Sequence, residues 1–386
     1  MNAKFGKIDF GLFAATLLLL GLGVVLVYSS SFALAHQRFG GADFFLSRQA
    51  YRALLALLCF IFFINIDYHI WGKLSNLLYL IAIGLLIYVL FLPESHAING
   101  ARRWITIGNV RFQVSDIARV VMIMYLARKC EESGPEIKKG KVFFLHLSKI
   151  CIMASLIVLE PDFSSAIILT FIGLSILFVS GARVSHIFLM IVSIVPVSFA
   201  LVFNTPYRRN RMLGFLNMPD RVEDLGYQTF QSLVGLGNGG LLGVGLGRGE
   251  QKYFYLPEPH TDFAFSILGE EIGFIGLVIV LCIFVFMIYR GLKISLNARD
   301  KLGQVMAFGF TITVTIYLLV HTCVSTGLIP TTGVPMPFLS YGGMSLIFTM
   351  STMGILLNIS SQTRDEIAVK ELSGIIGAPK KKKKKR

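Results

Sequence analysis

Runs of about 20 apolar residues with almost no charge recur along the chain, and they restrict its fold more than any other feature. The first extends from Asp9 to Tyr28 and has no small-residue cleavage pattern after it, so we expect it to be retained. Backbone polar groups in a bilayer must be satisfied within the protein, and a helix does so within one segment. The 386 residues are 54% hydrophobic and include 32 phenylalanines, which is typical of a chain that spans a membrane. The sequence therefore predicts an all-α integral membrane protein.

Nine spans are clear in a window of about 19 residues. They lie near residues 9–30, 49–66, 72–92, 145–160, 163–182, 186–203, 262–290, 303–326 and 340–359. A tenth candidate, Val114–Ala127, is weaker because its apolar run is short and carries Asp116 and Arg119. If it crosses, the basic segment Arg128–Lys149 falls on the same side as both termini, which the positive-inside rule makes the cytoplasm. We therefore expect about ten transmembrane helices.

The spans predict a single polytopic membrane domain over residues 1–363. A large outer loop at about residues 204–261 precedes the eighth span, and it is too long for a simple turn. Residues 364–386 form a cytoplasmic tail that ends in seven consecutive Lys or Arg residues. Because like charges repel one another and attract anionic lipid, we expect this tail to be disordered and to lie on the membrane surface.

Basic residues are unusually frequent in the loops assigned to the outside. They are Arg102, Arg103, Arg111, Arg208, Arg209, Arg211, Arg221, Arg248 and Lys252. Guanidinium groups match phosphate oxygens in two-point hydrogen bonds, so these residues could bind a polyanionic lipid headgroup. They could equally be solvated loop charges that touch anionic lipid.

Two pairs of ionisable residues lie within predicted spans, where charge is costly. Asp116 and Arg119 are three residues apart, so on a helix they share a face and can neutralise each other. Such a pair can line a cavity or simply seat the short helix. Glu270 and Glu271 lie within the eighth span, so they should face a polar cavity or a partner cation.

The glycine-rich stretch "GLGNGGLLGVGLGRGEQ", residues 235–251, allows close backbone approach and tight turns at the interface. It has no GxxxxGK[ST] pattern and no preceding strand, so a nucleotide site is not expected. The five cysteines show no CxxC spacing and are interpreted as packing residues. No metal site can be read from the sequence.

The stretch "YLPEPHTDF", residues 255–263, places Glu258, His260 and Asp262 directly before the eighth span. Unpaired N–H groups and the helix dipole favour an anion at a helix N-terminus, so Asp262 would be stabilised there. The alternative is that Asp262 only caps the helix. Glu258 and His260 could orient a substrate or pin the loop.

A second loop, "GLIPTTGVPMPFLSYGG", residues 327–343, separates two spans and cannot be helical throughout because it contains three prolines. We expect it to form a re-entrant wall at the interface. Its side chains Thr331, Thr332, Ser340 and Tyr341 can donate hydrogen bonds to a ligand. They can also satisfy backbone carbonyls that the prolines leave free.

These two regions, residues 226–276 and 325–343, together with "NGARRWITIG" and the ten-span layout, resemble the SEDS family. The name stands for shape, elongation, division and sporulation proteins, which polymerise peptidoglycan. The stretch "GLGRGEQKYFYLPEPHTDF" is more similar to the division member than to the elongation member. Four places depart from the family pattern. This chain has "QVSD" where the family has "QPSE", and "LEPDFSSA" where it has "LQPDLGTA". It has Arg119 in place of a lysine and His321 in place of an asparagine.

The resemblance implies an inverting glycosyltransferase that polymerises lipid II into β-1,4 glycan strands and releases undecaprenyl pyrophosphate. The essential acid of the family falls in "HTDF", which is Asp262 here, and a carboxylate there can accept the proton of the attacking sugar hydroxyl. We expect the substrate to be bound by Arg102, Arg103, Asp116, Arg119, Arg208, Arg209, Arg211, Arg248, Lys252, Glu258, His260, Thr332, Ser340 and Tyr341. Cations must balance the charge of the leaving pyrophosphate, either these side chains or a Mg²⁺ or Mn²⁺ ion.

The resemblance also implies a place in the bacterial cytoplasmic (inner) membrane, with the active site outside the cell. The expected partners are a class B penicillin-binding protein transpeptidase, other division proteins and anionic lipid, and no nucleic acid. Two other functions fit ten helices with broken segments: a lipid II flippase or a non-catalytic division scaffold. Against a transporter, the two halves show no inverted repeat of hydropathy.

Overall fold

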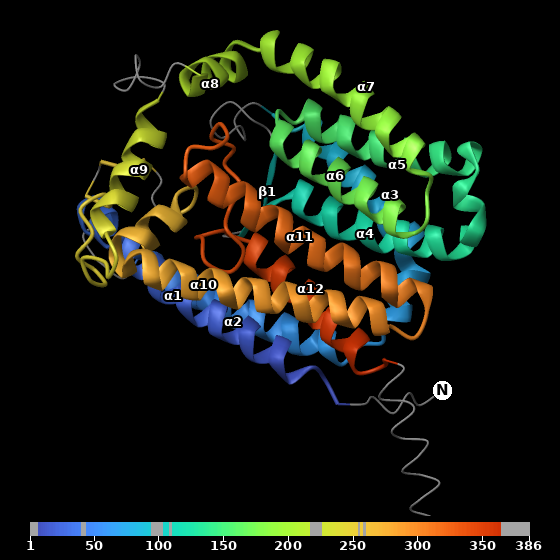
Figure 1. Cartoon of the computed structure of the whole chain (residues 1–386), viewed down its shortest axis with the longest axis horizontal. Coiled ribbons are helices and arrows are strands. Elements are labelled where there is room, and N and C mark those ends of the chain that lie inside the picture. The colour runs from blue at the N-terminus through green and yellow to red at the C-terminus, as the bar shows by residue number, and fades with distance from the viewer. Residues whose placement is uncertain are drawn as a thin grey trace, which may run out of the picture.

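The computed structural model describes residues 7–39, 44–93, 103–107, 110–216, 226–253, 255–257 and 260–363. Within these ranges the chain forms a helical bundle with one small hairpin (Figure 1). The helices are α1 (Phe10–Phe39), α2 (Phe44–Ile64), α3 (Tyr68–Leu90), α4 (Val114–Ser133), α5 (Gly140–Leu159), α6 (Phe163–Val179), α7 (Val184–Phe203), α8 (Pro206–Leu216), α9 (Tyr227–Gly239), α10 (Ala264–Asn297), α11 (Lys301–Ser325) and α12 (Ser345–Ser360). A short 3₁₀ helix, η2 (Gly134–Lys138), joins α4 to α5.

Each of the ten predicted spans coincides with a helix. Among the described residues, seven helices are long and apolar enough to cross a membrane, namely α1, α2, α3, α5, α7, α10 and α11. Two shorter apolar helices, α6 and α12, complete the nine clear predictions. The predicted helical multi-pass fold is therefore confirmed. The hairpin was not predicted: β1 (Trp104–Ile107) and β2 (Val110–Gln113) pair antiparallel, with Trp104 opposite Gln113.

Helix α4, the weak tenth candidate, lies in the interior of the bundle between α3, α6 and α11 (Figure 1). Its polar residues Asp116 and Arg119 are buried along with most of its apolar ones. Because protein rather than lipid surrounds it, the helix needs no apolar surface facing outward. Burial inside the bundle explains why hydropathy alone detects α4 only weakly.

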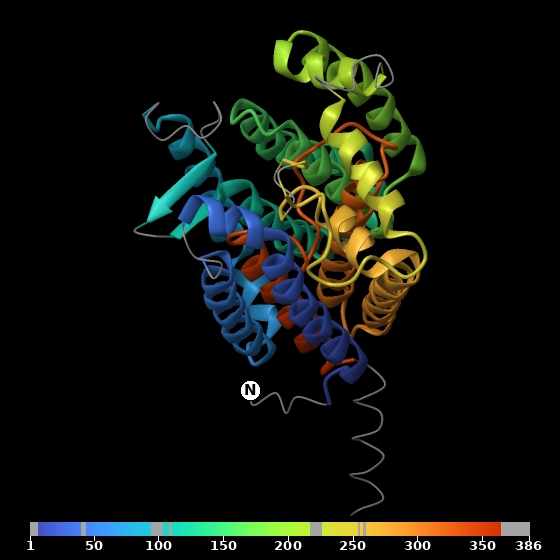
Figure 2. The same cartoon turned by 90° about the vertical axis from the view of Figure 1, so that its left-hand side faces the viewer.

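Helices α7 and α8 lie along the outside of the bundle (Figures 1 and 2). Helix α7 contains no buried residue, and large apolar side chains such as Phe188, Val195 and Phe199 are exposed along it. In a bilayer these side chains would contact lipid tails. Helix α8 follows at its end, and two of its arginines, Arg208 and Arg211, contact the bundle from that position.

Helix α10 is interrupted at Gly273, and the glycine-rich stretch forms hydrogen bonds with the backbone groups on both sides of the interruption. At Gly273 the backbone leaves the helical conformation, with φ 69° and ψ −176°. The N–H groups of Phe274 and Ile275 donate to the carbonyls of Gly240 and Leu241 at 2.9 and 3.1 Å. In return, Val244 N–H donates to the Glu270 carbonyl at 3.0 Å. The predicted close backbone approach is confirmed, because a β-carbon at Gly273 would lie 2.2 Å from the Gly243 nitrogen.

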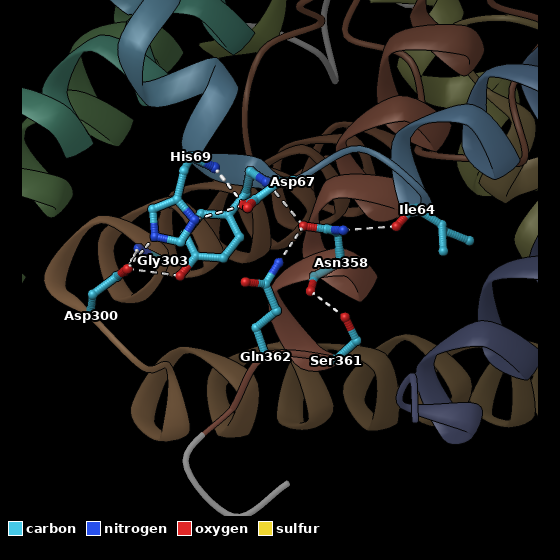
Figure 3. Close-up of polar contacts among 9 residues, drawn as sticks. Ile64, Asp67, His69, Asp300, Gly303, Asn358, Ser361 and Gln362 are labelled. Carbon is cyan, nitrogen blue, oxygen red and sulfur yellow. Dashed lines mark hydrogen bonds and ion pairs between the residues drawn. The ribbon is translucent and has the colours of Figure 1, made fainter. Parts of the chain in front are cut away.

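At the opposite end of the bundle, a polar cluster ties three elements together (Figure 3). The His69 ring lies between two carboxylates, with Nδ1 2.6 Å from Asp67 and Nε2 2.7 Å from Asp300. Asn358, near the end of α12, accepts from the Tyr68 N–H at 3.0 Å and donates to the Ile64 carbonyl at 2.8 Å. The α2–α3 turn, the α10–α11 turn and the end of α12 are therefore held at one end.

We expect Asp300→Ala to lower the unfolding temperature without affecting the other end of the bundle. Asp300 caps α11 through the Gly303 N–H at 2.7 Å and accepts from the Tyr68 hydroxyl at 2.9 Å. Loss of a cap alone costs about 1 kcal/mol. Thermal unfolding in detergent measures the effect, and Asp300→Asn, which keeps one acceptor oxygen, should lose less. An Asn variant as unstable as the Ala variant would contradict this role.

Candidate active site

The two loops singled out in the sequence meet at one end of the bundle. The Tyr341 N–H donates to the His260 carbonyl at 2.7 Å, and the two rings lie 5.3 Å apart in an edge-on contact. The Asp262 carboxylate lies against Gly333, where a β-carbon would be 3.6 Å from Oδ2. The acid before α10 and the proline-rich loop before α12 therefore form one junction.

Asp262 is half-buried and lies close to the start of α10, as predicted. The N-cap of that helix is Phe263, and α10 begins at Ala264. The structure therefore places Phe263 rather than Asp262 at the N-cap position of α10. Its position one residue before the cap turns its carboxylate toward the second loop, where Gly333 leaves room for it.

His321 of α11 connects α10 to the second loop from inside the bundle. It is fully buried, with Nδ1 2.9 Å from the Val334 carbonyl and Nε2 3.4 Å from the Phe265 nitrogen. A neutral ring that donates from Nδ1 and accepts at Nε2 satisfies both contacts. The imidazole thereby spans the distance between the helix and the loop, which is a positioning role.

Ser340 and Thr332 of the second loop have different environments. The Ser340 Oγ accepts from the Met336 N–H at 2.8 Å, so it satisfies the backbone of its own loop. The Thr332 Oγ is buried and has no hydrogen-bond partner within the described residues. Of the two sequence interpretations, the backbone role fits Ser340 and the ligand role fits Thr332.

Helix α8 places arginines beside this junction. Arg211 donates to the Thr331 carbonyl at 2.9 Å, so it reaches the second loop. Arg208 lies over the Phe163 ring at 5.1 Å and donates to the Leu201 carbonyl at 3.4 Å. Arg209 is exposed, as is Arg248 in the glycine-rich stretch.

Lys252 lies inside the protein rather than at the surface. Its ammonium is 2.7 Å from Glu271, and the Ser29 hydroxyl donates to the same carboxylate. This confirms the predicted need of Glu271 for a partner cation. Glu270 instead accepts the N–H groups of Glu250 and Gln251 at 2.9 and 3.3 Å. Both acids therefore attach the glycine-rich stretch to α10.

The predicted pair between Asp116 and Arg119 is confirmed at 3.1 Å. Arg119 also lies over the Tyr317 ring at 4.3 Å and donates to its hydroxyl. A small cavity runs from Arg119 and Tyr317 to Pro335 and Pro337 of the second loop. The pair is therefore connected by this cavity to the second loop of the junction.

A second acidic cluster surrounds the turn between α5 and α6. Asp162 caps α6 through the Ser165 N–H at 3.2 Å, accepts from Gln113 and Ser115, and lies 4.0 Å from Arg103. Glu160 is fully buried, and neither carboxyl oxygen has a hydrogen-bond partner among the described residues. Burial, together with the charge of Asp162, raises the pKa of Glu160 to about 9. Arg102 and Glu258 fall outside the described residues.

We expect Glu160→Gln to stabilise the protein increasingly as the pH rises. The pKa of Glu160 rises from 4.5 to about 9 on folding, so the folded state binds a proton that the unfolded state releases. The free energy of unfolding then falls between those pH values by about 1.4 kcal/mol per pH unit at most. A glutamine has the shape of the protonated acid and removes this dependence. Unfolding temperatures of both proteins at about pH 5 and pH 9 test it, and parallel curves would contradict it.

The fold and this junction define a multi-pass helical membrane protein with a polar site between two loops at one end of the bundle. A carboxylate, a buried hydroxyl and arginines meet there, which suits a ligand with sugar and phosphate groups.

Comparison with known proteins agrees with this description. The family model of FtsW, RodA and SpoVE, described as cell cycle proteins, matches residues 10–365. The chain therefore belongs to the FtsW/RodA/SpoVE family. It is 38% identical to the probable peptidoglycan glycosyltransferase FtsW of Geobacter sp. (strain M18), covering 89% of this chain and 94% of that protein. It is also 38% identical to the stage V sporulation protein E of Bacillus subtilis, covering 94% of this chain and 100% of that protein.

Solved structures share the fold. One chain of a peptidoglycan synthase complex that coordinates polymerization and crosslinking superimposes with a TM-score of 0.76 at 27% identity, covering 93% of this chain and 98% of that one. The rod shape determining protein RodA of Thermus thermophilus gives a TM-score of 0.69 at 24% identity, covering 92% and 98%.

Proposed function

We propose that this protein is a peptidoglycan glycosyltransferase that polymerises lipid II into β-1,4 glycan strands during septal wall synthesis in cell division. The proposal draws on the family membership and on the relatives named as peptidoglycan glycosyltransferases. The observation that carries it in this chain is the junction of Asp262 with Gly333 and of His260 with Tyr341.

In this proposal Asp262 is the general base. Its carboxylate takes the proton of the sugar hydroxyl as that oxygen bonds to the anomeric carbon, and the bond to undecaprenyl pyrophosphate breaks on the opposite side. The lipid-linked sugar is α and the product β, so a single displacement with inversion suffices. A second nucleophilic carboxylate is therefore not needed.

The negative charge that grows on the pyrophosphate must be balanced by cations. Arg211 is the predicted arginine with a direct bond to the second loop, and we assign this role first to it and then to Arg208 and Arg209. The described residues contain no group of three or more His, Cys, Asp or Glu side chains that could hold a metal ion. A Mg²⁺ or Mn²⁺ ion held by one or two carboxylates together with the substrate phosphates needs no such group, and we assign no step to a metal.

We further propose that the protein lies in the bacterial cytoplasmic (inner) membrane with the junction outside the cell. The polar cluster around His69 and Asp300 would then be on the cytoplasmic side with both termini. A class B penicillin-binding protein is the proposed crosslinking partner. The likeness to a chain of a peptidoglycan synthase complex supports this pairing.

One reconstitution separates the three candidate functions. Purified protein with its partner transpeptidase is supplied with lipid II in proteoliposomes, and both glycan strands and lipid II movement between leaflets are measured. The glycosyltransferase proposal expects strands. A flippase would move lipid II without forming strands, and a scaffold would do neither.

A further inference from the structure

Helix α2 turns one face toward the candidate site, although none of its residues was predicted to act there. The Phe45 ring lies 5.0 Å from the ring of His260 and 5.4 Å from that of Tyr341. Two turns further along, the Arg52 guanidinium lies 4.7 Å from the centroid of the Tyr341 ring. Gln49 lies between them on the same face, because positions four and seven residues apart follow one side of a helix.

Gln49 is an unusual core residue. It is 1% exposed, and it lies on the stripe of α2 that also buries Ala53, Ala56 and Phe60. Neither its amide nitrogen nor its amide oxygen has a hydrogen-bond partner among the described residues. A buried polar group without a hydrogen bond is destabilising, so nearly all such groups in proteins are bonded. The Gln49 amide therefore has hydrogen-bonding capacity that the described residues do not use.

Arg52 has the same property at the neighbouring turn. Arg52 is partly exposed, its Nη1 is buried without a hydrogen-bond partner, and the ion pairs found among the described residues do not include it. The flat face of the guanidinium stacks on the Tyr341 ring, so its N–H groups point away from that ring. A partly buried guanidinium without a carboxylate partner is suited to two phosphate oxygens.

We propose that Arg52 and Gln49 form a binding subsite for the head of a lipid-linked saccharide, next to the loop of Asp262. Arg52 takes a phosphate of the polyprenyl pyrophosphate group, and Gln49 bonds to the amide or hydroxyl of the sugar attached to it. This assignment rests on the proposed function and names two further residues of that site. Tyr341 fixes the guanidinium, and the packing of Phe45 on His260 fixes the helix against the Asp262 loop.

The test compares Arg52→Gln, Arg52→Lys and Gln49→Leu with the wild type in steady-state lipid II polymerisation. Arg48→Gln is the matched control, because Arg48 is exposed and contacts the Phe44 ring in a similar way at 4.1 Å. Loss of a charged hydrogen bond should raise the KM of Arg52→Gln for lipid II about tenfold or more, with a smaller change in kcat. Arg52→Lys should recover only part of the loss, and Arg48→Gln should behave as the wild type.

A binding measurement in the inactive Asp262→Asn background separates the two roles and the source of the phosphate. Arg52→Gln should weaken the binding of both lipid II and undecaprenyl pyrophosphate. Gln49→Leu should weaken the binding of lipid II alone. Phosphatidylglycerol vesicles should not compete with either. Equal competition by phosphatidylglycerol, or unchanged KM and binding in both Arg52 variants, would overturn the subsite.

The two proposals fail in different ways. If the wild type forms no strands, the proposed function fails. If the wild type forms strands and Arg52→Lys and Arg52→Gln form them with normal KM, the subsite alone fails. Because Arg52→Lys keeps the charge and most of the volume, it also covers the case in which Arg52→Gln does not fold.

Discussion

Asp262→Asn should abolish strand formation while leaving lipid II bound. Removing a general base costs about 10²- to 10⁴-fold in rate. The asparagine keeps the size of the side chain beside Gly333 and loses only the ability to take a proton. The measurement is the initial rate of polymerisation by purified protein with its partner, together with lipid II binding.

The matched control for that experiment is Asp67→Asn. Asp67 belongs to the cluster at the opposite end of the bundle, where it contacts His69, so its substitution tests a lost carboxylate away from the candidate site. Its polymerisation rate should match that of the wild type at temperatures where both are folded. A polymerisation rate of Asp262→Asn within a few-fold of that of Asp67→Asn would show that Asp262 is not the general base.

Glu271→Leu alone should strongly destabilise the protein. The substitution leaves the Lys252 ammonium buried beside an apolar side chain, and breaking a buried pair in this way costs about 3–5 kcal/mol. Lys252→Met alone should cost a similar amount, because it leaves the Glu271 carboxylate buried instead. The double variant should recover much of the loss, since no unpaired charge then remains. Unfolding temperatures of the three variants form the test.

The exposed pair between Glu136 and Lys139 provides the contrast. Its side chains are 60% and 67% exposed, and water solvates each charge when the other is removed. Glu136→Gln should therefore leave the unfolding temperature unchanged. If Glu271→Leu also left the unfolding temperature unchanged, the attachment of the glycine-rich stretch to α10 would not depend on the pair between Lys252 and Glu271.

The spans were predictable because hydrocarbon imposes a single requirement on each segment that faces it. Helices α7 and α10 satisfy that requirement directly, and their apolar runs identify them. Helix α4 does not face lipid, so its Asp116 and Arg119 could be paired inside, and charge asymmetry rather than hydropathy indicated it.

The hairpin was missed although a signal was present. The strands "WITI" and "VRFQ" are rich in β-branched and aromatic residues and flank the dipeptide Gly108–Asn109. Two such runs separated by two turn-forming residues are typical of a hairpin. The segment lies in a loop between two predicted spans, so the hydropathy pattern that identifies the spans does not indicate it.

The candidate site was only partly predictable. Motif resemblance identified Asp262 and the second loop, and charge alone nominated Lys252, which proves to be buried against Glu271. Gln49 and Arg52 belong to an apolar helix far away in the sequence, and only the tertiary contacts with Tyr341 and His260 reveal them. Charge and polarity in the sequence indicate candidate residues, but the tertiary packing determines which of them can face a ligand.

Chemical rescue tests the role of the Asp262 carboxylate most directly. Asp262→Cys, purified with its partner, should form no strands from lipid II. Alkylation of that cysteine with iodoacetate places a carboxylate at this position again and should restore strand formation, whereas iodoacetamide, which adds a neutral amide, should not. Equal recovery with both reagents, or full activity of the cysteine variant before treatment, would contradict the assignment.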